Sequence, residues 1–417
     1  MRSSSAAVYS LSSFRFISHS QSNCRASQKS NSSIHVSFRT SFVSKDRLRT
    51  GLNSSYQVGG WNWKWGKVEN LSNRASSSSS SVAPADLEDV QEQCSEQEKL
   101  MRELTAFLEK DLPHLFDEQG IDRRMYDKSV EFKDPITQYD SLEGYLFNIQ
   151  LLRWLFGPLF ELHSVKQTGP NEITTRWTMT MNFRLLPWNP ELVFTGTSVM
   201  SVNPETGKFC RHVDYWDSIK NNEYFSFEGL IDVLKQLRIY KTPDLETPKY
   251  QILKRTADYE VRKYEPFIVV DTKGDKLTGS SGFNNVTGYI FGKNTREEKI
   301  PMTTPVFTQM MDRELSQVHI QIVLPLERQL SELPEPLLEG VKLKKTEENF
   351  AAVTKFSGKP IEEIVLEKEN FLRSSLIRDG IRPKSGCMLA RYNDPGRTWS
   401  FIMRNEVLIW LDTFVLE

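Results

Sequence analysis

The sequence has few of the features that assign a chain to a common functional class. Its 417 residues include only four cysteines, with no CxxC and no close pair (Cys24, Cys94, Cys210 and Cys387). They predict neither a disulfide framework nor a cysteine metal cluster, and a reducing compartment fits this usage. No run of eighteen apolar residues occurs, so we expect no membrane-spanning helix. The formal net charge of −1 argues against an electrostatic hold on nucleic acid as the main role.

The motifs of common enzyme classes are also missing. The sequence contains no phosphate-binding glycine loop, no nucleophile elbow and no zinc-ligand spacing. The length predicts two domains plus flanking segments. A hydrophobic content of 38% is enough to build their cores.

Acidic residues are absent from the first 45 positions, and the first one is Asp46. This segment is rich in serine and has scattered Lys and Arg but no long apolar stretch, which is typical of an organelle transit peptide. We therefore predict that residues 1–85 form a transit peptide and a disordered serine-rich linker, with the mature start between Ser44 and Ser81. The serine content favours a chloroplast, and the alternative is a serine-rich tail that carries no address.

Residues 94–241 are predicted to form an α+β domain. EKLMRELTAFLEKDLPHLF places its apolar residues on one helical stripe, and SLEGYLFNIQLLRWLFGPLF predicts a second helix, apolar on nearly all sides and therefore buried. NEITTRWTMTMNF alternates as a strand does, and ELVFTGTSVMSV and KFCRHVDYWDSI predict two more before a last helix, FEGLIDVLKQLRIY. Helices followed by long antiparallel strands favour helices on one face of a curved sheet.

The segments DPITQYDSLEGY and HVDYWDSI resemble the nuclear-transport-factor-2-like (NTF2-like, SnoaL-like) family, especially its uncharacterised plant and cyanobacterial domain. The resemblance implies a cone in which the sheet closes around a pocket. His212 and Asp214 are two residues apart on a strand and so share one face. This pair is either a base oriented by a carboxylate inside the cone or a structural pair that ties the sheet to a loop. His163 and Asp134 have the same two interpretations.

Residues 242–250 contain Pro243 and Pro248 and few apolar residues, which predicts a linker. Residues 251–417 then show a strand–helix–strand–strand pattern twice, which indicates a duplicated unit. Each unit needs the other to cover its sheet. We therefore predict one pseudo-symmetric α+β domain, a curved sheet or distorted β-barrel with two helices.

Seven motifs follow one another across residues 250–416: YEVRKYEPFIV, FNNVTGYIFGKN, EKIPMTTPV, VLP…LPEP, VTKFSG, ARYNDP and MRNEV. Together they resemble the SOUL/haem-binding-protein family, and the whole chain resembles its chloroplast-targeted plant members. The resemblance implies non-covalent binding of haem or another tetrapyrrole. In that family the macrocycle lies on a shallow apolar cleft beside the first helix, where basic side chains meet its propionates.

The resemblance assigns the ligand to seven positions in and after the first helix of this domain: Phe283, Val286, Tyr289, Ile290, Lys293, Lys299 and Met302. Their helical spacing places most of them on one face. There the apolar side chains would cover the ring at roughly 25 cal/mol per Å² buried. Lys293, Arg296 and Lys299 could each pair a propionate, for at most about 1 kcal/mol when exposed. The same stripe would also pack the helix on the sheet, so each residue contacts either the ligand or the core.

The sequence contains few side chains that could coordinate the iron of a haem. His319 is the one histidine of residues 251–417, and it lies in the alternating strand HIQIVL. It is either an axial ligand or, as we favour, a strand histidine satisfied by its neighbours. Cys387 and Met302 are softer candidates that fit a core equally well, and the absence of CxxCH excludes covalent c-type attachment. We therefore predict no metal ligand, and reversible binding that distinguishes little between haem and metal-free porphyrins.

The leading hypothesis is a plastid carrier or buffer of tetrapyrroles, in the chloroplast stroma or at plastoglobules, which supplies haem metabolism and has no chemistry of its own. The partners that this implies are tetrapyrroles and haem-metabolising enzymes such as haem oxygenase, with peripheral contact to a membrane or plastoglobule. Two alternatives stay open. The N-terminal domain could isomerise or hydrate a small apolar metabolite through His212 and Asp214, or both domains could dock on lipid droplets or on another protein.

Overall fold

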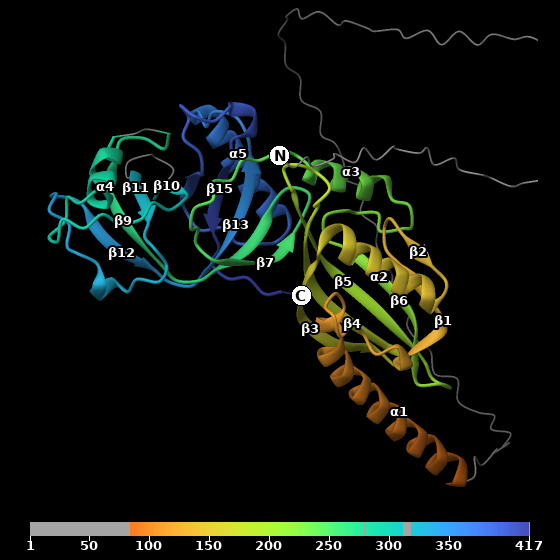
Figure 1. The fold of residues 1–417 in the computed structure, drawn as a ribbon. Coiled ribbons are helices and arrows are strands. Elements are labelled where there is room, and N and C mark those ends of the chain that lie inside the picture. Colours follow the sequence, from red (N-terminus) through yellow and green to blue (C-terminus); the bar gives the residue numbers. More distant parts are fainter. Residues whose placement is uncertain (1–83, 279–280, 312–317, 417) are drawn as a thin grey trace, which may run out of the picture. The chain divides into compact units, whose positions relative to one another are not determined.

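A computed structural model describes residues 84–278, 281–311 and 318–416 (Figure 1). These residues belong to one compact unit, Ser79–Glu417. The predicted transit peptide and linker, residues 1–85, lie outside the described residues except where helix α1 (Pro84–Asp111) begins, so both remain predictions. Within the described ranges the strands form two sheets. No helix there is long and apolar enough to cross a bilayer.

The N-terminal domain is built on a six-stranded sheet in the order β2-β1-β6-β5-β4-β3. Its neighbours pair antiparallel, except for the parallel pair of β1 and β6. The strands are β1 (Tyr126–Lys133), β2 (Gln138–Tyr139), β3 (Leu159–Gly169), β4 (Glu172–Asn182), β5 (Glu191–Asn203) and β6 (Lys208–Trp216). The helices are α1, α2 (Leu142–Phe156) and α3 (Phe227–Gln236), so the predicted α+β class is confirmed.

Helix α2 differs from its prediction in length and in burial. Ser141 begins it by accepting a hydrogen bond from the backbone N–H of Gly144, and Gly157 ends it in the left-handed conformation at φ 53°. The chain then enters β3, whose first residues the sequence had assigned to the helix. The helix also exposes Phe147 (57%) and Trp154 (72%). The prediction of burial on all sides is therefore wrong, because the sheet covers only one face.

The C-terminal domain contains a nine-stranded sheet in the order β12-β9-β11-β10-β14-β15-β13-β8-β7. All of its printed pairings are antiparallel. The strands are β7 (Tyr250–Arg255), β8 (Glu260–Tyr264), β9 (Phe267–Gly274), β10 (Val306–Met310), β11 (Val318–Val323), β12 (Lys342–Thr346), β13 (Asn349–Phe356), β14 (Cys387–Arg391) and β15 (Asn405–Trp410). The helices are α4 (Phe283–Ile290) and α5 (Glu362–Arg378).

The order of this sheet confirms the predicted duplication. Strands β9, β11 and β10 with α4 form one repeat, and β13, β15 and β14 with α5 form the other, joined at the antiparallel pair of β10 and β14. In addition, β12 pairs with β9 of the first repeat, although it directly precedes the second repeat in the chain. In the same way β8 pairs with β13 of the second repeat, although it directly precedes the first. The end strands β12 and β7 do not pair with each other among the described residues. Closure into a barrel is therefore not confirmed.

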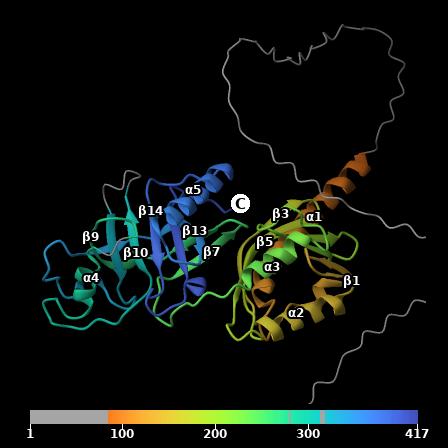
Figure 2. The ribbon, with the colours of Figure 1, turned by 90° about the horizontal axis from the view of Figure 1, so that it is seen from above.

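The two helices cover equivalent parts of the duplicated sheet. Helix α4 packs on β9 and β11, and α5 packs on β13 and β15 (Figures 1 and 2). Beneath α4 lies an apolar cluster that includes Val286 and Ile320, and beneath α5 a second cluster includes Leu372 and Ile409. Each helix is thus anchored by its own core.

The predicted linker, residues 242–250, has no helix or strand before β7 begins at Tyr250. Strand β7 contacts β4 and β5 of the N-terminal sheet. Arg255 of β7 forms a bidentate pair with Asp232 of α3 at 2.9 Å, and both side chains are nearly buried. Thr178 of β4 donates to the carbonyl of Ile252 at 2.7 Å. The linker therefore joins two domains that are also in direct contact.

Candidate functional site

The seven predicted ligand residues divide into buried and exposed side chains. Val286, Tyr289 and Ile290 each have 0% exposure and belong to the cluster beneath α4. The Tyr289 hydroxyl donates to the carbonyl of Pro334 at 2.8 Å, which satisfies its polar end. Phe283 packs against the same cluster and is partly buried. These apolar residues hold α4 on the sheet, and the first three have no exposed surface in this conformation. Their contact with a ligand stays a prediction.

The remaining three predicted residues lie on the outer surface. Lys293 and Lys299 are exposed, and Met302 is 41% exposed. Arg296, also considered a propionate partner, instead donates to the carbonyl of Glu332 at 2.8 Å. The surface around α4 therefore offers a ligand two lysines and one thioether, with Phe291 as an additional exposed ring.

His319 is held by its strand neighbours, as the sequence indicated. Its Nδ1 lies 3.0 Å from Oδ2 of Asp271, a carboxylate that also pairs with Lys344 at 2.7 Å and accepts from Gln321 at 2.9 Å. A histidine in this network is already partnered. Among the described residues no group of three or more His, Cys, Asp and Glu side chains is arranged to hold a metal ion.

The N-terminal domain contains a cavity of about 50 Å³ that His212, Asp214 and Asp134 help to line. A directed chain of hydrogen bonds runs along its wall. The Tyr145 hydroxyl lies 2.9 Å from Nδ1 of His212, whose Nε2 lies 2.8 Å from Asp214. Ser198 donates to the same carboxylate at 2.5 Å.

Two further groups on this cavity wall are chemically unusual. Burial raises the pKa of Asp134 to about 6, despite hydrogen bonds from Thr137 and Ile136 that act to lower it. The Thr175 hydroxyl, 1% exposed, has no hydrogen-bond partner among the described residues. A volume of this size holds a few water molecules or a molecule of a few heavy atoms. His163, by contrast, lies outside this wall and bonds the Thr178 hydroxyl at 2.8 Å.

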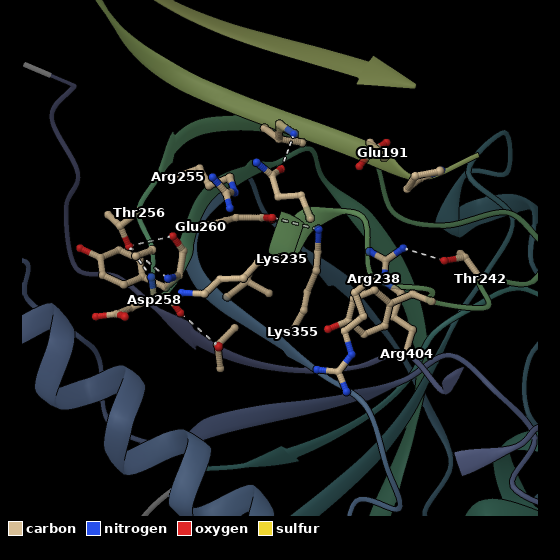
Figure 3. Close-up of a pocket in the computed structure, with 18 of the residues that line it drawn as sticks. Glu191, Lys235, Arg238, Thr242, Arg255, Thr256, Asp258, Glu260, Lys355 and Arg404 are labelled. Atoms are coloured by element: carbon tan, nitrogen blue, oxygen red, sulfur yellow. Dashed lines mark hydrogen bonds and ion pairs between the residues drawn. The ribbon is translucent and has the colours of Figure 1, made fainter. Parts of the chain in front are cut away.

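A much larger cavity, of about 1030 Å³, is lined by residues of both domains (Figure 3). We call it the interdomain cleft. The N-terminal domain contributes the β4–β5 connection and the end of α3 with the chain that follows it. The C-terminal domain contributes the β7–β8 turn, part of β13, and single residues from α5 and from the segment before β15. Its volume reaches the upper end of the roughly 300–1,000 Å³ usual for ligand pockets.

The charges of the interdomain cleft are unevenly paired. On the C-terminal side Lys355 bonds Glu260 at 2.9 Å, as the dashed line in Figure 3 marks, and Arg404 bonds Glu406 at 2.7 Å. On the N-terminal side neither Lys235 nor Arg238 forms an ion pair among the described residues. Both are exposed. Arg238 donates to the Ser357 hydroxyl and lies over the Tyr240 ring at 5.6 Å.

Sequence reasoning did not find this cleft, because its residues come from segments far apart in the chain. One signal was present. LKQLRIY, at the end of the last N-terminal helix, combines Lys235, Arg238 and Tyr240 within six positions, shortly before a predicted linker. None of the seven predicted ligand residues lines the cleft or the smaller cavity.

The two domains match two different protein families. The family described as "SOUL heme-binding protein" matches residues 245–410. The family described as "Uncharacterized conserved protein (DUF2358)" matches residues 102–212. The curated protein Heme-binding protein 2 of Homo sapiens is 30% identical over 164 residues, covering 37% of this chain and 78% of the human protein. Its counterpart from Mus musculus is 30% identical over 158 residues, covering 35% of this chain and 74% of the mouse protein.

Two solved structures illustrate weaker overall likenesses. An NTF2-like protein of unknown function from Exiguobacterium sp. 255-15 has a TM-score of 0.22 and 14% identity, covering 26% of this chain and 95% of that chain. A hydrolase from Listeria innocua has a TM-score of 0.30 and 11% identity, covering 37% of this chain and 92% of that chain. Likenesses at this level say nothing about what this protein does.

Proposed function

Because the chain belongs to the family of SOUL haem-binding proteins, we propose that it binds haem or a related tetrapyrrole reversibly and acts as a carrier or buffer. The observation that supports this most strongly is the family match over almost the whole C-terminal domain, residues 245–410. The 30% identity to Heme-binding protein 2 of two mammals supports it independently.

The binding that we propose depends on burial of the ring and not on an iron–protein bond. His319 is engaged by Asp271 at 3.0 Å. A macrocycle that covers apolar surface gains roughly 25 cal/mol per Å², which suffices for reversible binding without coordination. Such a carrier would pass its ring to enzymes of haem metabolism. The predicted transit peptide supports a chloroplast location for this role.

Replacing His319 with alanine is expected to leave haemin binding within about twofold of the unchanged chain. Asp271 keeps its bonds to Lys344 and Gln321 after this change, so the strand should persist. The measurement is a titration with haemin, followed by the Soret absorbance and by quenching of tryptophan fluorescence. A titration of the unchanged chain that shows no saturable signal would refute the proposed function. A large loss of affinity in His319→Ala would refute binding without coordination.

The cavity of the N-terminal domain favours a second candidate function. The hydrogen-bonded series Tyr145–His212–Asp214 is suited to proton transfer at a small, mostly apolar molecule. It lies beside the Thr175 hydroxyl, which has no partner in the part of the chain that the structure describes. If this domain catalyses such a transfer, the protein should accelerate the exchange of the α-protons of acetone with D₂O, followed by NMR, and Asp214→Asn should abolish the acceleration. An exchange rate equal to that in buffer would exclude an enolising activity on this probe.

A further inference from the structure

The interdomain cleft offers a ring-shaped ligand aromatic surfaces from both domains. Trp188 of the β4–β5 connection is 39% exposed, and its indole N–H is fixed by a 3.0 Å hydrogen bond to the carbonyl of Leu237. On the other side Phe371 of α5 is 47% exposed, and both side chains line the cleft. Exposed aromatic faces that line a cavity are the surfaces on which a flat macrocycle packs.

The cleft also offers anionic groups a place to bind. Of its cationic side chains, Arg255, Lys355 and Arg404 each have a carboxylate partner in the protein. Lys235 and Arg238 have none among the described residues. Of the acidic side chains that line it, Asp258 pairs with Arg378 and Glu260 with Arg262 and Lys355.

Glu191 is the remaining acidic side chain that lines the cleft, and it has no cationic partner among the described residues. Its single negative charge compares with two positive charges, those of Lys235 and Arg238, that have no carboxylate partner among the described residues. The cleft therefore retains one uncompensated positive charge, located on the N-terminal side at the end of α3.

We propose that the interdomain cleft is the site at which this chain holds its tetrapyrrole, with Lys235 and Arg238 pairing the propionates and Trp188 and Phe371 contacting the ring. This inference rests on the proposed function and assigns its location. Lys235, Arg238 and Trp188 lie outside residues 245–410, the part of the chain that the SOUL family matches. The N-terminal domain thus supplies half of a site that the SOUL domain alone does not form.

The composition of the cleft fits binding without coordination. Its lining among the described residues includes no His, Cys or Met, the side chains that most often hold a haem iron. Of its two tyrosines, Tyr259 already donates its hydroxyl to Asp379 at 2.8 Å. The alternative surface beside α4 is less suited to a ring, because Val286, Tyr289 and Ile290 are fully buried there.

The test is a charge reversal in the cleft, Lys235→Glu with Arg238→Glu, made in the whole chain and titrated with haemin and with protoporphyrin IX. An exposed ion pair contributes about fivefold in affinity at most, and the double variant removes two such pairs, so we expect both ligands to bind about 25-fold more weakly. The loss should shrink in high salt, because the pairs are exposed. Lys235→Glu alone, which leaves the Arg238–Ser357 contact intact, should weaken binding by about fivefold.

Two control variants show whether the cleft is responsible. Lys166→Glu changes an exposed lysine of β3 that lines neither cavity and should leave both affinities unchanged. Lys293→Glu with Lys299→Glu reverses the same amount of charge beside α4 and should also leave them unchanged. If this second variant weakens binding and the cleft variants do not, the ring lies beside α4. The inference would then be wrong while the proposed function stands. If the unchanged chain binds neither ligand, the proposed function itself fails.

Discussion

Replacing Glu406 with glutamine is expected to lower the free energy of unfolding by about 3–5 kcal/mol, because the change removes a buried carboxylate that neutralises two guanidinium groups, those of Arg262 and Arg404. Arg262 and Glu406 are both 0% exposed, and their side chains form two hydrogen bonds of 2.9 and 3.1 Å. Removing one member of such a pair costs far more than removing an exposed pair. Chemical denaturation at pH 7, followed by far-UV circular dichroism, measures the change.

After the change Glu260, 2.7 Å from Arg262, is the remaining carboxylate partner of that guanidinium, and it is shared with Lys355. Besides Arg262, the Glu406 carboxylate accepts from Arg404 at 2.7 Å and from the Tyr392 hydroxyl at 2.9 Å. A glutamine keeps one acceptor oxygen, and whichever way its amide is turned, the N–H groups face a guanidinium, which has no acceptor to offer. The variant therefore loses charge pairing and creates an unsatisfied donor in the same place.

Acid should weaken the unchanged protein through the same network. Burial acts to raise the pKa of Glu406, but Arg262 and Arg404 together lower it below its ordinary value of 4.5. The pKa of Glu260 is lowered to about 2, as Lys355 and Arg262 overcome the effect of burial. The stability from a carboxylate with a lowered pKa is present above about 4.5 and is lost as the pH falls through the folded-state value. Glu406→Gln should reduce the stability loss between pH 4.5 and pH 2.

Glu348→Gln is the matched control for Glu406→Gln. Glu348 pairs with Lys263 at 3.1 Å, and both side chains are exposed, at 56% and 38%. Its loss should cost less than about 1 kcal/mol. Similar costs for the two variants would contradict the account of a buried ionic network in the C-terminal domain.

Replacing Ile290 with alanine is expected to cost about 2–5 kcal/mol of stability while leaving haemin affinity unchanged. Ile290 is 0% exposed and packs beneath α4 with Val286 and Ile320, so truncation opens a cavity in a core. The resemblance to haem-binding proteins had assigned this residue to the ligand. Denaturation and haemin titration of the same preparation, at a temperature well below unfolding, separate the two roles.

Phe291→Ala provides the comparison for Ile290→Ala. This neighbouring side chain is 60% exposed, so its removal should change stability by no more than about 0.5 kcal/mol, as for most surface positions. If the ring lay beside α4, Phe291→Ala would weaken binding although the fold is unaffected. If Ile290→Ala lowers the affinity for haemin under conditions in which the variant is fully folded, the helix must open to admit the ligand.

The fold of the C-terminal domain was largely predictable, because its signals are local. Alternating or apolar stretches located β8, β9, β13 and β15, and the repeated order of elements indicated the duplication. Strand β12 (Lys342–Thr346) was missed, since it is an edge strand with exposed lysines and no apolar alternation. In the N-terminal domain strand β3 was missed, because its first residues continue the apolar run of α2.

The candidate site was harder to predict, because helical spacing does not say which side a stripe faces. Val286 and Ile290 share a face, as the sequence indicated, but that face lies on the sheet. The interdomain cleft depends on packing between domains, which no local pattern contains. By contrast, the pairing of His212 with Asp214 followed from their spacing on one strand and is confirmed at 2.8 Å.

The central claim is that this chain holds a tetrapyrrole by burying its ring without bonding its iron, and the most direct test is the ratio of two dissociation constants. Haemin and metal-free protoporphyrin IX should be titrated into the same preparation of the whole chain, with tryptophan quenching as the common signal. The account predicts a ratio within about threefold of one, equivalent to less than about 0.7 kcal/mol. Binding of haemin more than about a hundredfold tighter than of protoporphyrin IX would contradict it, because only coordination of the iron distinguishes the two rings so strongly.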